Sequence, residues 1–341
     1  MKSSDGIGKR IKMNNIYLED VNIEGFKSFS EKTNMGFQSG IGVIIGNNGV
    51  GKSNILDAIV WALGENDLGR IRCYENQELF FAGSKDYPPA SKIRVELNLK
   101  EGEKKDASGI QLTRERTKNG EDQYWIDKTS YTREAYCQKL DAYNLRHCLE
   151  TIIRQEQIND LIQLNPLQRF DYIRHILDIE SEEEAVGCLN EIIGPLFQRY
   201  MSYLIPLGEV RLDSISKNGR KGLEIEVNLP GNRLRRAHQL SGGEKSITSL
   251  ALKLAVFHQL ESPFFLLDEV EPSLDYTNHK SMQAFLKDVA DSKQLIMITH
   301  LRSTIALANT VHGVRTRWDG SSFMKFYFVM DERLLRLYKC C

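Results

Sequence analysis

The 341-residue chain carries a net charge of −1, and 27% of its residues are charged, so any nucleic-acid binding has to come from a local basic patch. No apolar stretch approaches the roughly 18 residues of a membrane span, and the first residues, MKSSDGIGKRIK, lack the apolar core of a secretion signal. We therefore expect a soluble, cytoplasmic protein without a membrane partner.

The first elements in chain order predict an antiparallel β lobe. Residues 1–15 are expected to form a flexible N-terminal tail. Residues 16–28, IYLEDVNIEGFKS, alternate apolar and polar side chains, which predicts the edge strand of a hairpin. Three more short strands are expected, separated by the turns EGEKKDASG and KNGED. These strands are Lys92–Leu99, Ile110–Arg116 and Gln123–Asp127.

The stretch GVIIGNNGVGKSN matches the pattern G-x-x-x-x-G-K-[ST], between a buried strand expected at 41–45 and an amphipathic helix expected at 54–63. Glycines allow successive N–H groups to face phosphate oxygens, and the start of the helix adds the positive end of its dipole. Lys52 would reach the β- and γ-phosphates, and the Ser53 hydroxyl would bind Mg²⁺. A plain glycine turn is the alternative, but strand, loop and helix in this order favour a phosphate-binding loop.

The second part of the chain alternates strands with helices. A helical pattern covers 166–203 and is interrupted near the acidic run at 180–184. The order of the later elements predicts an α/β protein, with a mainly parallel sheet covered by helices on both faces. Those elements are strands at Val210–Ser214 and Leu223–Asn228, a largely helical segment at Gln239–Leu260, a strand at Phe264–Leu267, a helix from Thr277 and a strand at Gln294–Thr299.

Two segments of this second part carry further candidate site residues. LSGGEKS places Ser241, Gly242 and Gly243 at the start of a long helix, which suits an anion but would alone be an ordinary helix cap. FFLLDEVEPSLD is a buried strand ending in Asp268 and Glu269, at the end where α/β sheets bind ligands. Asp268 could hold Mg²⁺ through water, and Glu269 could polarise an attacking water. The two carboxylates could be merely solvated at the end of the strand. The same chain also carries two helix starts that suit an anion, and this combination favours a ligand site for the carboxylates.

Together these segments resemble the head domain of structural maintenance of chromosomes (SMC) ATPases, members of the ABC ATPase superfamily. The resemblance rests on LSGGEKSITSLALKLAVF, PFFLLDEVEPSLD and IEGFKSF…GNNGVGKSNILDAIVWALGE, and it covers about residues 16–175 and 195–330. It implies an ABC-type P-loop ATPase that hydrolyses ATP with Mg²⁺. It also implies a homodimer in which each ATP lies between the Walker A loop of one head and the LSGGE serine of the other.

The resemblance implies roles for individual residues. Gln155, in ETIIRQEQINDLI, matches the Q-loop glutamine that contacts Mg²⁺ and water, although Arg154 and Glu156 replace the small residues usual beside it. His300, in IMITH, matches the switch histidine that contacts the γ-phosphate. The implied catalytic residues are Glu269, His300 and Gln155, and the implied metal ligands are Ser53, Gln155 and Asp268.

The nucleotide-binding residues follow in the same way. Arg72 falls near the family's arginine loop, which touches nucleotide and DNA, and Arg70 is the alternative register. Asp275 matches the D-loop, in which Pro272 replaces the commoner alanine and should stiffen the turn. The implied nucleotide-binding residues are Gly46, Asn47, Asn48, Gly49, Gly51, Lys52, Ser53, Asn54, Arg72, Ser241, Gly242, Gly243 and Asp275.

The expected organisation is an N-terminal half of the head at 16–165, a short helical stub at 166–203 and a C-terminal half at 204–335. SMC proteins separate their two halves by a long coiled coil and a hinge, whereas neither helix of this stub should exceed about 30 Å at about 1.5 Å per residue. The chain is therefore a natural head without arms, or a head whose arms have been removed. The segment ESEEEAVG is unlike a Gly/Ser linker and favours a natural head.

DNA is the expected partner, mainly because of the resemblance. Basic residues gather in two loops, but such runs are usually only solvated. The resemblance implies a chromosome-associated protein of chromosome maintenance, segregation or repair, nuclear in a eukaryote, and leaves a kleisin-like partner open. The alternative is an ATP-switched clamp on DNA or protein in DNA repair, like RecF-type proteins, which also lack long arms. The basic loops are Lys217, Arg220 and Lys221, and Arg233, Arg235 and Arg236.

Overall fold

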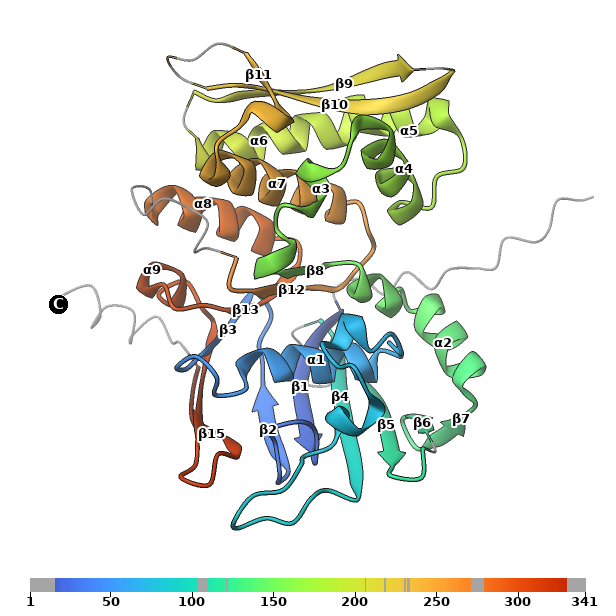
Figure 1. Ribbon diagram of the computed structural model, residues 1–341, viewed down its shortest axis with the longest axis vertical. Helices are drawn as coiled ribbons and strands as arrows, with labels where there is room; N and C mark the ends of the chain where they lie inside the picture. Colours follow the sequence, from blue (N-terminus) through green and yellow to red (C-terminus); the bar gives the residue numbers. More distant parts are fainter. Residues whose placement is uncertain are drawn as a thin grey trace, which may run out of the picture. The chain divides into compact units, whose positions relative to one another are not determined.

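The computed structural model describes residues 16–102, 109–120, 122–205, 207–217, 219–229, 231, 234–270 and 279–329 (Figure 1). The chain divides into two compact units. Unit 1 comprises Met1–Ser39, Asn47–Leu149 and Val314–Phe326, and unit 2 comprises Gly40–Gly46, Glu150–Gly313 and Tyr327–Cys341. Among the described residues, no helix is both long enough and apolar enough to cross a membrane.

Unit 1 contains the expected antiparallel sheet, with the strand order β2-β1-β4-β5-β6-β7 (Figure 1). Buried side chains fix its register, because Val21 of β1 lies opposite Leu97 of β4, which lies opposite Leu112 of β5. The edge position expected for the first strand is wrong, because β2 pairs with its free side. The strands are β1 (Ile16–Glu24), β2 (Thr33–Gly36), β4 (Lys92–Glu101), β5 (Gly109–Thr117), β6 (Asp122–Ile126) and β7 (Thr129–Tyr131).

Two α-helices accompany this sheet. Helix α1 (Lys52–Ala62) packs against β1, β4 and β5, and its residues from Ile55 to its end are buried. Helix α2 (Arg133–Ala142) packs on β6 and begins at Thr132, whose hydroxyl accepts the N–H of Ala135. Three short 3-10 helices complete the unit: η1 (Gly69–Ile71), η2 (Asn76–Leu79) and η3 (Leu145–Leu149).

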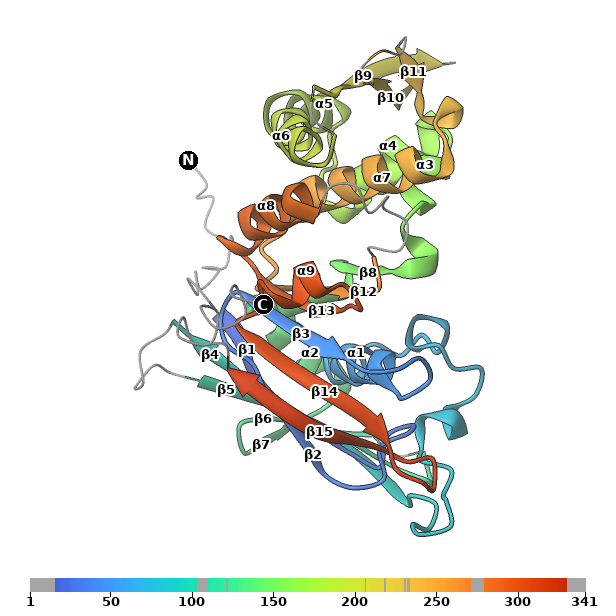
Figure 2. The ribbon, with the colours of Figure 1, turned by 90° about the vertical axis from the view of Figure 1, so that its left-hand side faces the viewer.

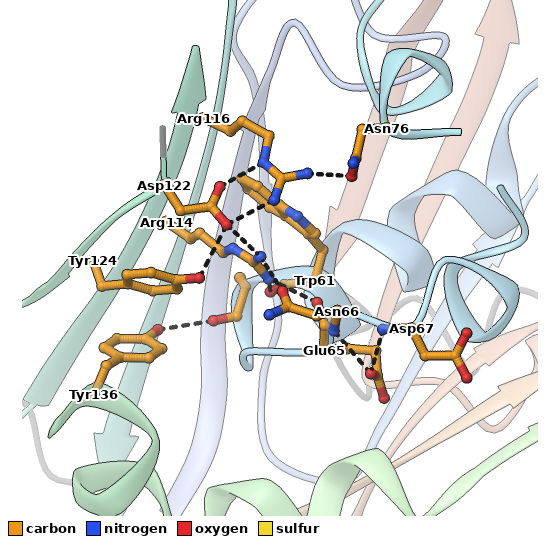
Figure 3. A network of polar contacts seen from close by, with 11 residues as sticks. Trp61, Glu65, Asn66, Asp67, Asn76, Arg114, Arg116, Asp122, Tyr124 and Tyr136 are labelled. Carbon is orange, nitrogen blue, oxygen red and sulfur yellow. Dashed lines mark hydrogen bonds and ion pairs between the residues drawn. The ribbon is translucent and has the colours of Figure 1, made fainter. Parts of the chain in front are cut away.

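A buried arginine of β5 holds the end of α1 (Figure 3). Arg114 is fully buried and donates to the backbone oxygens of Trp61 and Glu65, both at 2.7 Å, while its guanidinium lies 4.4 Å from the centroid of the Trp61 ring. Asp122 of β6 accepts a further bond from Arg114 at 3.0 Å and supplies the opposite charge. Because the last carbonyls of a helix lack partners within the helix, Arg114 caps α1 from a neighbouring strand.

Replacing Arg114 by methionine should destabilise unit 1. The substitution removes a buried donor from the oxygens of Trp61 and Glu65 and one of the two cations from Asp122, so we expect the free energy of unfolding to fall by about 3–5 kcal/mol. Denaturant unfolding followed by tryptophan fluorescence measures the change. Arg133→Met, on the exposed side of α2, should change that free energy by no more than about 0.5 kcal/mol. If Arg114→Met and Arg133→Met lowered the free energy of unfolding equally, the capping role of Arg114 would be contradicted.

The expected parallel sheet has the order β14-β3-β13-β12-β8, with every neighbouring pair parallel, and it lies in unit 2 except for the end of β14. All residues of β12 and β13 are buried, as is typical of central strands in a parallel sheet. Figure 2 shows β15 beside β14 at the edge, and these two strands were not among the expected elements. The bounds are β3 (Ile41–Ile45), β8 (Ile152–Arg154), β12 (Phe264–Asp268), β13 (Gln294–Ile298), β14 (Thr310–Thr316) and β15 (Ser322–Val329).

A second sheet of unit 2 is antiparallel, with the order β11-β10-β9 (Figure 1). Helix α4 packs on β10, and α6 packs on β9, α7 and α8. These elements and the remaining helices have the following bounds: β9 (Glu209–Lys217), β10 (Arg220–Asn228), β11 (Arg235–Arg236), η4 (Gln155–Gln157), α3 (Asp160–Gln163), α4 (Pro166–Ile176), α5 (Glu182–Cys188), η5 (Leu189–Ile193), α6 (Gly194–Leu204), η6 (Ala237–Gln239), α7 (Gly242–Phe257), α8 (His279–Ala290) and α9 (Arg302–Ile305).

The helical stub has two limbs, as expected. The first limb is α4, which begins at Asn165 with a capping box and a proline at its first turn. The second limb begins at Ser181, whose hydroxyl accepts the N–H of Glu184, and runs from α5 through the π-helical turn η5 into α6. From Glu182 to Leu204 this limb is about 34 Å long at about 1.5 Å per residue, slightly more than the expected limit. The expected length of about 30 Å was too short because the helix continues without a break from α5 through η5 into α6.

Candidate functional site

The pairing of parallel strands in unit 2 aligns four strand ends. Ile44 of β3 pairs with Ile298 of β13, Ile298 pairs with Asp268 of β12, and Asp268 pairs with Arg154 of β8. Because all four strands point the same way, the residues that follow this row emerge at one edge of the sheet, where α/β proteins bind their ligands. The residues directly after the row are Ile45, Thr299, Glu269 and Gln155.

The glycine loop that follows β3 leads into α1. Asn47, Asn48 and Gly49 are exposed, and Gly49 and Gly51 adopt left-handed φ angles of 79° and 92°. A Cβ atom at Gly51 would lie 2.4 Å from the hydroxyl oxygen of Ser28, so only glycine fits at this helix start. Gly51 has no side chain with which to cap α1, and a helix start of this kind suits an anion.

The two residues after Gly51 start α1. The Lys52 side chain is buried and donates to the backbone oxygen of Asn47 at 3.0 Å, so it folds back along the loop. Ser53 and Asn54 are half-buried on the first turn of the helix. The lysine therefore lies against the loop whose sequence pattern predicts a phosphate site.

The carboxylates at the end of β12 have different surroundings. Asp268 is buried, with one carboxylate oxygen 3.9 Å from a guanidinium nitrogen of Arg154. Glu269 adopts a left-handed φ of 48°, a conformation that is strained for a residue with a side chain. Its Oε1 lies 3.1 Å from Nε2 of His300, so the histidine can fix the direction of the carboxylate. The structure thus brings Glu269 and His300 together, directly after the strand end that carries Asp268.

Gln155 lies in η4, directly after β8, and its side chain is exposed. Arg154, expected beside it, points into the protein and is only 3% exposed. Side chains of α7 hold the residues that follow: Ser249 and Lys253 donate to the backbone oxygens of Ile158 and Gln157, respectively. Burial lowers the pKa of Lys253 to about 8. The segment after Gln155 is therefore fastened to α7, the helix of the LSGGE motif.

Ser241 caps α7 through a capping box. Its hydroxyl accepts the N–H of Glu244 at 3.4 Å, and the Glu244 carboxylate accepts the N–H of Ser241 at 2.7 Å. The ordinary helix-cap role considered from the sequence is therefore present. Ser241, Gly242 and Gly243 are nonetheless all exposed, so this helix start remains accessible to an anion from outside the unit.

A cleft of about 950 Å³ lies beside the start of α1 in unit 1. Arg72 and Asn54 both line it, and an Nη2 nitrogen of Arg72 lies 3.3 Å from the Asn54 side-chain oxygen. Arg70 instead pairs with Glu65 at 3.1 Å and donates to the backbone of Leu149. Of the two arginine registers, the one through Arg72 therefore reaches the nucleotide-loop helix.

Sequence reasoning missed two cleft residues next to Asn54. Lys27 and Ser28 belong to the GFKSF segment, and the Ser28 hydroxyl accepts a bond of 2.8 Å from the Asn54 side chain. The missed signal was the GFKSF segment itself, which carried the family resemblance but supplied no site residue. Asp275, Pro272 and Arg233 lie outside the residues that the structure describes.

The basic loops are partly neutralised. Arg220 lies 2.8 Å from Asp171, Arg235 lies 3.5 Å from Glu244, and Arg236 is 4.0 Å from a neighbouring carboxylate on β10. These separations describe ion pairs at the protein surface, which contribute little to stability. The described arginines of both loops are therefore solvated pairs and do not by themselves mark a nucleic-acid interface.

Comparison with known proteins places this geometry in a family. The RecF/RecN/SMC N terminal domain family matches residues 17–322. The chromosome partition protein Smc of Fusobacterium nucleatum is 37% identical over 176 residues, which cover 50% of this chain and 14% of that protein. The chain thus matches about one seventh of the length of that relative.

Solved SMC heads share the fold. A crystal structure of an Smc head bound to the C-winged helix domain of ScpA has a TM-score of 0.82 and 31% identity, covering 93% of this chain and 99% of the solved one. The Smc head of Pyrococcus furiosus with an extended coiled coil, bound to the C-terminal domain of ScpA, has a TM-score of 0.78 and 26% identity, covering 95% and 99%. The parallel sheet, antiparallel lobe and helical stub are those of an ABC-type P-loop ATPase head.

Proposed function

The chain belongs to the RecF/RecN/SMC N terminal domain family as an SMC-type ATPase head, and on that premise we propose that it binds ATP with Mg²⁺ and hydrolyses it to ADP and phosphate. The observation that carries this proposal is the row of four strand ends. It brings the start of the glycine loop, the carboxylates of β12, His300 and Gln155 to one edge of a parallel sheet.

Each residue of the site has a role in this proposal. The loop amides and Lys52 bind the β- and γ-phosphates, and Glu269 accepts a proton from the attacking water. His300 holds the Glu269 carboxylate in place through their 3.1 Å contact. The hydroxyl of Ser53, the carboxylate of Asp268 and the amide oxygen of Gln155 would supply oxygen ligands, which Mg²⁺ prefers. Bound there, Mg²⁺ would neutralise phosphate charge.

We further propose that two heads close on two ATP molecules. Each head presents an exposed helix start at Ser241, Gly242 and Gly243 that suits an anion, in addition to its glycine loop. One nucleotide rarely needs two such starts from the same subunit. A partner head would supply the second one, and Asp275 would act at the same nucleotide.

The biological role that we propose follows the relatives. The curated relatives are named chromosome partition proteins, which supports a chromosome-associated, cytoplasmic ATPase coupled to DNA. The solved heads bound to ScpA support a kleisin-like partner for this head as well. The alternative is a RecF-like clamp, in which ATP binding switches the grip on DNA or protein and hydrolysis only resets it. Measuring the ATPase rate with and without duplex DNA separates the two, since stimulation by DNA favours the SMC-type motor.

Lys52→Ala should abolish ATP binding. The substitution removes the cation that pairs with the β- and γ-phosphates, and we expect the affinity for ATP to fall by at least about a hundredfold. Isothermal titration calorimetry with Mg²⁺ and ATP measures the change. Lys128→Ala, in the exposed turn between β6 and β7, is the matched control and should bind as the unmodified chain does. Unchanged affinity in Lys52→Ala would refute the loop assignment.

Glu269→Gln should keep ATP binding but slow turnover by about 10²–10⁴-fold, because the amide preserves the shape and loses the basicity that activates water. The ATP-bound dimer should accumulate, and light scattering during sizing with ATP would detect it. Glu134→Gln, in the exposed first turn of α2, should hydrolyse normally. A Glu269→Gln protein that stays monomeric and turns over at the normal rate would remove Glu269 from this role.

Ser241→Arg should allow the monomer to bind ATP but prevent dimerisation, because the cationic side chain would fill the space in which the partner's γ-phosphate meets the helix start. Neither Ser241→Arg nor Lys52→Ala should hydrolyse ATP alone. Mixed together they form one complete site, so partial ATPase activity should return. Ser130→Arg, on the exposed edge strand β7, is the control for the added charge. Full activity of monomeric Ser241→Arg would rule out the two-head mechanism.

A further inference from the structure

A buried carboxylate on α1 binds two cations of unit 1. The Asp57 side chain is fully buried, and its Oδ2 lies 2.6 Å from Nζ of Lys27 and 2.7 Å from Nη2 of Arg72. Arg72 also donates through Nε to both oxygens, at 3.2 and 3.3 Å. Asn54 lies one turn before Asp57 on the same face of the helix, and it contacts both Arg72 and Ser28. One face of the nucleotide-loop helix therefore organises the wall of the cleft.

The backbone at both cations is unusual. Lys27 has a φ of 48° and Arg72 a φ of 58°, and both are left-handed conformations that long side chains rarely adopt. Neither residue is a glycine, so the surrounding structure has to hold both of them in place. Lys27 also donates to the backbone oxygen of Ile71, next to Arg72, at 2.5 Å. The two strained positions are thus linked to each other as well as to Asp57.

A second carboxylate, Asp122, also holds two cations, one of which lines the cleft (Figure 3). Arg116 binds Asp122 through two bonds of 2.6 and 2.8 Å and donates to the Asn76 side chain at 2.5 Å. The charged residues that line the cleft are the cations Lys27, Arg72, Arg116 and Lys118 and the carboxylates Glu75 and Glu78. Cations therefore outnumber carboxylates on its surface, while Asp57 and Asp122 lie behind it.

A buried carboxylate is costly unless its partners are well placed, and an apolar residue would fill the same space on α1 at no such cost. The arrangement instead fixes the direction of two cations at the mouth of a cleft. We propose that Asp57 is a positioning residue that orients Lys27 and Arg72 toward a phosphate group bound in this cleft. The phosphate belongs to ATP or to a nucleic-acid backbone, and this inference rests on the proposed function of the head.

Binding measurements on Asp57→Asn test the proposal. The amide keeps the shape of the side chain but loses the charge that holds both cations, so affinity for the phosphate ligand should fall by about tenfold. Calorimetry with Mg²⁺ and ATP is one arm, and fluorescence anisotropy with a short DNA duplex is the other. If affinity falls for ATP alone, the phosphate in the cleft is that of ATP. If it falls for the duplex alone, the phosphate is that of DNA. Asp141→Asn is the matched control, because Asp141 pairs with Arg146 at 3.2 Å on the exposed surface.

A double-mutant cycle separates positioning from a general effect on folding. Because Asp57 acts through its cations, Asp57→Asn should cost little further affinity once Lys27→Met and Arg72→Met are both present. Arg72→Met alone should lower the slope of log affinity for DNA against log salt by about one if the phosphate is that of DNA. An effect of Asp57→Asn that persists at full size in the Lys27→Met/Arg72→Met background would overturn the proposal.

Two further outcomes keep the proposal separate from the function it rests on. An unmodified chain that binds no ATP would count against the proposed function. Normal binding of ATP and DNA by both the unmodified chain and Asp57→Asn would overturn the positioning role alone. If Asp57→Asn does not fold, the affinities of Lys27→Met and Arg72→Met for ATP and for duplex DNA test the proposal instead. Both side chains line the cleft. Unchanged affinity for both ligands in these two variants would also overturn the proposal.

Discussion

The hydrogen-bonded register of the parallel sheet in unit 2 is the constraint on which the candidate site depends. The row from Ile44 through Ile298 and Asp268 to Arg154 comes from residues more than 250 positions apart along the chain. A slip of one residue in any strand would turn its side chains to the other face and withdraw its end from the edge. The buried side chains of β12 and β13 pack in this register, so the apolar core and the polar strand ends are positioned together.

Buried charge has a similar organising role in unit 1. Arg114 caps the end of α1, and Asp57 binds two cations near its beginning. Both groups are fully buried, and each is compensated by partners that come from other elements. Such pairs add little net stability, because desolvation offsets their attraction, but losing one partner is strongly unfavourable. The helix that follows the glycine loop is therefore held in one position by contacts that are hard to replace singly.

Periodicity and motif spacing predicted the sheet classes, the glycine loop and the carboxylates at the end of β12, because these depend on local pattern. The interior position of β1 was missed, since β2 is only four residues long and Met35 is its only large apolar side chain. The pairing of Asp57 with Lys27 and Arg72 was missed because these side chains come together only through folding, from segments 30 and 15 residues away. Arg154 looked like a disturbance of the Q-loop, but its side chain turns inward toward Asp268. Side-chain direction of this kind cannot be deduced from spacing.

The capping box at Ser241 has a consequence for which residues this position can accept. The hydroxyl uses a lone pair to accept the N–H of Glu244, which leaves its own hydrogen available to donate. Aspartate caps helices as well as serine does, but it offers no hydrogen and carries a negative charge. An aspartate here would therefore satisfy folding and repel an approaching anion. Helix stability would select the two residues about equally, so a preference for serine would record the ligand and not the fold.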